Sequence, residues 1–109
     1  MPKVFIVEKP KDNIDVSEFG EMTCIFEPGE NRVNPFNCMS YGMEIIKRIE
    51  IKGGMKPEDS FLTIGPQIWV MTAYAAIITR WPSILILLLN PADNKYVQRR
   101  IESFYWEAG

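Results

Sequence analysis

The sequence contains no histidine, and this absence removes several kinds of chemistry at once. A serine or cysteine nucleophile activated by histidine, a histidine general base and histidine metal ligands are all excluded. Any catalysis would have to use carboxylates, lysine, tyrosine or a thiol. The sequence therefore favours a binding role over an enzymatic one, and it predicts no cofactor and no metal.

Cysteine is scarce as well, since Cys24 and Cys38 are the only two. Their spacing has no metal-site signature. The chain begins Met-Pro-Lys and runs directly into an apolar stretch at 4–7, which is too short for the core of a secretion signal. Because disulfides are rare in the cytosol, we expect a cytoplasmic protein with two buried free thiols.

The chain also lacks a strong excess of charge of either sign. Its net charge is −2 and its pI is about 5.1. A generic nucleic-acid binder needs a basic surface that displaces counterions from phosphates, so we expect no generic nucleic-acid binding. A length of 109 residues with 47% apolar residues is typical of one globular domain, which we place at 1–109.

Apolar runs alternate with turn-forming residues in a pattern that predicts an α/β fold. We expect a small Rossmann-like sheet with a central βαβ crossover and an antiparallel C-terminal hairpin. The uninterrupted apolar run from Ile84 to Leu89 is typical of a strand buried on both faces. Strands are expected near 4–7, 22–26, 61–64, 84–89 and 95–101, and helices near 35–52 and 66–81.

The first predicted helix has clear start and stop signals. Asn34 can cap it, Pro35 suits the first helical position, and the Gly-Gly pair at 53–54 can end it in a left-handed conformation. Met39 and Met43 fall on its apolar face, and we expect them to fill the core.

The second predicted helix is apolar on almost every side, and such a helix is normally buried on every side. A small domain has one sheet to cover it, so we predict that a second subunit covers the rest, most simply in a two-fold dimer. The alternative is that the aromatic residues 104–106 cover it within one chain. The expected interface residues are Trp69, Ala73, Tyr74 and Ile77.

The same region raises the alternative of a membrane span. Residues 66–89 form an apolar stretch long enough to cross a bilayer. Arg80 and Pro82 lie in its middle, where a charge is costly and a proline breaks the helix. We therefore rank membrane association third among the functional readings.

Four residues are candidates for a ligand site at one edge of the sheet. Gly65 and Pro66 stand between a predicted strand and a helix, where α/β folds bind ligands and helix N-termini attract anions. Glu8 and Glu27 follow two other predicted strands, and paired carboxylates can bind a cation or act as acid and base. The structural alternatives are a tight turn at Gly65 and solvated strand ends.

A small group of basic residues is predicted near the hairpin. It could contact phosphates or an acidic partner. The alternative is that these charges protect an edge strand from pairing with other chains. The group consists of Arg80, Lys95, Arg99 and Arg100.

Residues 65–69 read Gly-Pro-Gln-Ile-Trp, and Pro82, Pro91 and a Tyr-Val pair at 96–97 follow. Over residues 65–97 this pattern resembles a CRISPR-associated ring-nuclease family with a Gly-Pro-x-Trp helix start. Such proteins cleave cyclic oligoadenylate, but the family pattern carries histidines after the Trp and this chain has none. In length and composition the whole chain resembles small accessory proteins of phages and mobile elements.

These observations rank three functions. The first is a non-enzymatic accessory or regulatory protein that binds a protein or a small ligand as a homo-oligomer, with a host or defence factor as a fitting partner. The second is a phosphate-ligand or nucleotide-binding domain with weak nuclease activity at the Gly65 edge. The third is a membrane-associated protein.

Overall fold

The computed structural model describes residues 1–11, 13–27 and 37–102, and these form a mixed α/β fold. Every predicted strand and helix is present in it, with bounds shifted by a few residues. In chain order the elements are β1 (Lys3–Glu8), β2 (Glu21–Phe26), α1 (Cys38–Ile51), β3 (Ser60–Leu62), α2 (Gln67–Arg80), β4 (Ser83–Asn90) and β5 (Lys95–Glu102).

The strands form one sheet in the order β2-β1-β3-β4-β5. The first four are parallel to their neighbours, and β5 pairs antiparallel with β4. Parallel neighbours need a crossover connection, and α2 supplies it between β3 and β4. The predicted Rossmann-like sheet, the βαβ crossover and the C-terminal hairpin are therefore confirmed.

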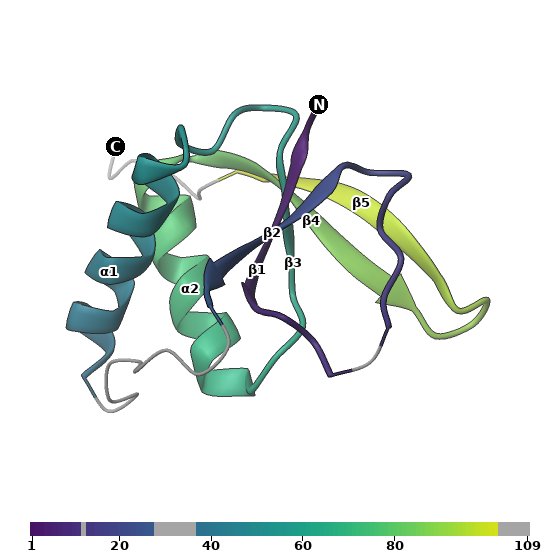
Figure 1. Ribbon diagram of the computed structural model, residues 1–109, viewed down its shortest axis with the longest axis horizontal. Helices are drawn as coiled ribbons and strands as arrows, with labels where there is room; N and C mark the ends of the chain where they lie inside the picture. Colours follow the sequence, from purple (N-terminus) through teal and green to yellow (C-terminus); the bar gives the residue numbers. More distant parts are fainter. Residues whose placement is uncertain (12, 28–36, 103–109) are drawn as a thin grey trace, which may run out of the picture.

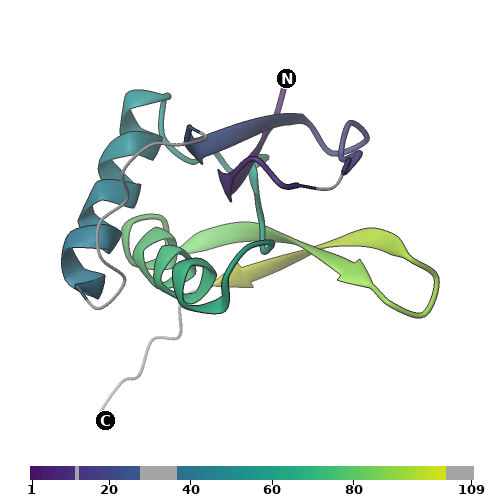
Figure 2. The same ribbon diagram turned by 60° about the horizontal axis from the view of Figure 1, so that its bottom comes forward.

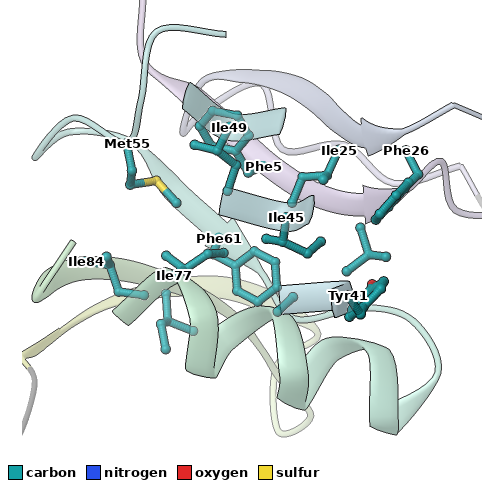
Figure 3. Close-up of a cluster of buried hydrophobic side chains, with 13 residues drawn as sticks. Phe5, Ile25, Phe26, Tyr41, Ile45, Ile49, Met55, Phe61, Ile77 and Ile84 are labelled. Atoms are coloured by element: carbon teal, nitrogen blue, oxygen red, sulfur yellow. The ribbon is translucent and has the colours of Figure 1, made fainter. Parts of the chain in front are cut away.

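Both helices lie side by side on one face of the sheet (Figures 1 and 2). The other face is covered by the segment that joins β1 to β2, from which Val16 is buried against Val4, Ile6 and Leu62. The main core lies between the helices and the sheet, where side chains such as Phe61 interdigitate with residues of both helices (Figure 3). Burying each large apolar side chain contributes roughly 1.5–3 kcal/mol.

Short polar contacts define the ends of α1. The Asn37 side chain accepts a hydrogen bond from the Ser40 N–H at 3.3 Å, so the helix starts after Asn37. The predicted cap and first residue, 34–35, lie outside the described residues. Gly53 and Gly54 have φ angles of +105° and +81° and donate to the last carbonyls of the helix, as predicted.

A buried carboxylate joins the start of β1 to the turn before β3. Asp59 is 2% exposed, and it accepts hydrogen bonds from the Lys3 N–H at 2.8 Å and the Lys56 N–H at 2.9 Å. It lies at the amino end of β3, opposite the end that leads to Gly65. Asp59 therefore holds the backbone at Lys3 and Lys56 in place, and it does not face the candidate ligand edge.

The prediction that 84–89 is buried on both faces is wrong for its last two residues. Ile84 and Leu87 are buried, but Leu88 and Leu89 are 39% and 46% exposed. The reason is that β3 has three residues and pairs no further along β4 than Leu87. Beyond that point β4 has β5 as its described neighbour, and the hairpin extends away from the helices (Figure 2).

Candidate binding surface

A groove of about 610 Å³ runs between the outer sides of α1 and α2. Among the residues that the structure describes, none that lines it is charged. Its walls combine long flexible side chains, mostly from α1, with small side chains, mostly from α2. The lining residues are Cys38, Met39, Gly42, Met43, Ile46, Ile68, Met71, Thr72, Ala75, Ala76 and Thr79.

The groove corrects the prediction for the two methionines of α1. Met39 and Met43 are 77% and 66% exposed, whereas Tyr41, Ile45 and Ile49 are the side chains of α1 that enter the core. The apolar residues of α1 occupy more than one stripe of the helix, and the sequence pattern favoured the stripe that faces away from the sheet. The methionines therefore form a surface instead of filling the core.

The groove differs electrostatically at its two ends. At the C-terminal ends of the helices, Arg80 Nε lies 3.3 Å from Glu50 Oε1, and the Arg80 guanidinium lies 5.0 Å from the centre of the Trp81 ring. At the N-terminal ends, neither helix has an acidic residue in its first turn, and Pro66 supplies no side-chain cap to α2. The backbone N–H groups in the first turns of the two helices give the N-terminal end of the groove a partial positive charge.

The exposed residues of α2 differ from the predicted interface residues. Ala73 and Ile77 are fully buried in the core of the single chain, so neither can contact a second subunit. Trp69 and Tyr74 are half-buried and pack against the same core. The outer residues of this helix are Ile68, Met71, Ala75 and Thr79.

A second apolar hollow, of about 340 Å³, lies between α2 and the β4–β5 hairpin. Met71 lines both this hollow and the groove, so the two form one continuous apolar surface. We call this surface the α2 face and define it by the groove, the hollow and the outer residues of α2. The hollow is lined by Thr63, Val70, Met71, Tyr74, Ile86, Leu88 and Ile101.

The Gly65 edge has the predicted topology but resembles a tight turn rather than a ligand cradle. The carboxyl ends of β1, β2 and β3 meet at one edge, because these strands are parallel. Gly65 has a φ of +140°, and a Cβ there would lie 3.3 Å from Val70 Cγ2. Glu27 lines a different hollow, on the outer side of α1, together with residues such as Glu44 and Lys47.

The two cysteines are thiols, but neither is fully buried. Cys24 is half-buried and Cys38 is exposed at the first position of α1, so the prediction of two buried thiols is wrong. Burial, and to a smaller extent the negative charge of Glu27, raises the pKa of the Cys24 thiol. A thiol shifted in this direction is a weaker nucleophile at neutral pH.

The predicted basic cluster does not form. Arg80 pairs with Glu50, and Lys95 lies at the hairpin turn, at the other end of β5 from Arg100. Arg99 and Arg100 are neighbours in a strand and so point to opposite faces of the sheet. Arg100 donates to Ser83 Oγ at 3.2 Å and to the Pro57 carbonyl at 2.8 Å, which gives it a structural role.

In the described part of the chain, no group of three or more carboxylate or thiol side chains could hold a metal ion. Neither α1 nor α2 is both long and apolar enough to cross a bilayer. Residues 104–106, the predicted alternative cover for α2, lie outside the described residues.

No protein-family model, curated protein or solved structure matches the chain. The resemblances noted for residues 65–97 and for the whole chain therefore stay predictions.

Proposed function

We propose that this protein acts by binding another protein through the α2 face, without catalysing a reaction. The observation that carries the proposal is the clustering of exposed apolar side chains. Met39, Met43, Ile68 and Met71 are all at least 47% exposed, and all four line the same uncharged groove. Contiguous apolar patches on a protein surface mark interaction sites, and methionine adapts its shape to different partners.

The lining of the groove favours a protein over a polar small molecule. Small-ligand sites combine an apolar wall with a few polar groups that fix the orientation of the ligand. The hydroxyls in the described lining of this groove are those of Thr72 and Thr79, and Thr79 Oγ1 already donates to the Ala75 carbonyl at 2.7 Å. Little remains that could orient a nucleotide or another polar ligand.

The charge of the groove also favours a protein over a phosphate ligand. A phosphate ligand would need cationic side chains to replace its hydration. Arg80 directly follows the lining residue Thr79, and it is engaged with Glu50 and with the Trp81 ring. The face is therefore suited to apolar side chains of another protein.

The test is site-specific photo-crosslinking in cells of the native host. A photoreactive apolar amino acid replaces Met71 on the α2 face or, as the control, Ser17 on the opposite side of the molecule. We expect a covalent protein adduct for position 71 and none for position 17. Both positions are exposed, so the substitutions should leave folding intact, which thermal unfolding checks.

Two results would contradict the proposal. One is the absence of any protein adduct at position 71 when the probe is incorporated and active. The other is the same set of adducts at positions 71 and 17, which would show contact by collision rather than by binding.

A further inference from the structure

The outer side of α2 is divided by side-chain size along its length. Ile68 and Met71, in the first half of the helix, are large, whereas Ala75 and Thr79 in the second half are small, as is Thr72 near the middle. All five line the groove. With a rise of about 1.5 Å per residue, the row from Ile68 to Thr79 is roughly 16 Å long.

From this division we propose that the protein bound by the α2 face is a second copy of this chain, packed about a two-fold axis perpendicular to α2. The two α2 helices then run antiparallel. Met71 of one copy packs against Ala75 of the other, and Ile68 packs against Thr79. Two-fold interfaces must be self-complementary, and a face with a large half and a small half satisfies that condition.

Electrostatics favours the same antiparallel arrangement. It sets the N-terminal end of each groove, with no acidic residue in the first helical turns, beside the C-terminal helix ends of the other copy. Opposite ends of helix dipoles attract each other. Because the described lining of the groove has no charged residue, the contact would bury no unpaired charge from it.

The size of the face predicts a weak dimer. Each helix has 14 residues and is therefore about 21 Å long and about 10 Å wide. Two helices and the adjoining hairpin present roughly 600 Å² per copy, or about 1,200 Å² in total, at the lower end of specific interfaces. We therefore expect dissociation in the micromolar range.

The inference rests on the proposed function, because it names the protein that the α2 face binds. The test measures the solution mass of the purified full chain, by sedimentation equilibrium, from low micromolar to near-millimolar concentration. We expect the wild-type mass to rise from one chain to two. Ser17→Lys, on the opposite side of the molecule, is the matched control and should behave like the wild type.

Two single variants test the register. Met71→Glu and Ala75→Lys should each stay monomeric, because each would bury two unpaired charges in the interface. An equimolar mixture of the two should dimerise, since one Glu then meets one Lys and the other contact keeps its wild-type Met71–Ala75 pair. Circular dichroism checks that each variant is folded, which we expect because both positions are exposed.

A wild-type chain that stays monomeric throughout overturns the inference, and a position-71 adduct to a different protein would then leave the proposed function standing. A wild-type dimer whose single variants still dimerise, or whose mixed variants stay monomeric, overturns the antiparallel α2 contact. The absence of any protein adduct at position 71 in cells overturns both the proposed function and the inference that rests on it.

Discussion

Gly42 of α1 faces Ala76 of α2 at close range, since a Cβ added at position 42 would lie 3.4 Å from the Ala76 Cβ. That distance is an ordinary van der Waals contact, and Gly42 has no strained backbone angle. The small pair forms the floor of the groove, over which Met39 and Met43 stand.

We predict that Gly42→Ala stabilises the protein by about 0.5–1 kcal/mol, because alanine restricts the unfolded chain and favours the helix. Urea denaturation measures the change in the free energy of unfolding. Gly42→Leu is the contrasting variant, and it should destabilise by about 1–3 kcal/mol because it would force the helices apart. A loss of stability in Gly42→Ala would show that the helices pack more tightly than the contact distance indicates.

Gly65→Ala is predicted to destabilise the protein by about 1–3 kcal/mol. The φ of +140° is a conformation that a side chain strains, and the new Cβ would also press against Val70. Thermal and urea unfolding measure the effect. Unchanged stability would contradict the tight-turn interpretation and would favour the alternative that this edge is a ligand site.

Asp59→Ala should lower the free energy of unfolding by about 2–4 kcal/mol, because two backbone N–H groups lose a buried acceptor. Asp59→Asn retains one carbonyl oxygen and should cost about half as much. The control is Asp93→Ala, which removes an exposed acceptor of the Lys95 N–H at the hairpin turn. Equal effects at positions 59 and 93 would contradict a special role for the buried carboxylate.

The Asp15 carboxylate accepts a hydrogen bond from Ser17 Oγ at 2.6 Å and from the Ser17 N–H at 3.0 Å. Both bonds, the side-chain bond more strongly, lower the pKa of Asp15. Because the folded-state pKa is depressed, the stabilising contribution is present above the unfolded-state pKa. It is lost as the pH falls through the folded-state pKa.

We predict that Ser17→Ala raises the pKa of Asp15 toward its ordinary value. The measurement is a titration of the Asp15 carboxyl ¹³C shift by NMR in the wild type and the variant. Glu18→Ala is the control, since it removes a neighbouring exposed side chain that is not bonded to Asp15. An identical Asp15 titration midpoint in Ser17→Ala and the wild type would contradict the assignment of the shift to this hydroxyl.

The candidate surface was only partly predictable from the sequence. The apolar character of α2 is predictable from the sequence, and a second subunit as its cover stays a prediction. The specific residues were not, because Ala73 and Ile77 fit a helix face as well as Met71 and Ala75 do. The small residues Gly42, Thr72 and Ala76 carry the signal that was missed, since they allow the two helices to approach and leave the methionines outside.

The sequence by itself determined the succession of strands and helices along the chain, the parallel crossover and the hairpin, whereas the order of the strands within the sheet came from the structure. Local signals are sufficient for these features: the glycines at 53–54 stop α1, Pro82 ends α2, and the turn residues at 90–94 reverse the chain. The tertiary structure decided which apolar stripe of each helix faces the sheet. It also placed Lys95 at the opposite end of β5 from Arg100. These outcomes depend on contacts between residues far apart in the chain, and residue types and spacings along one segment do not specify which neighbour lies opposite.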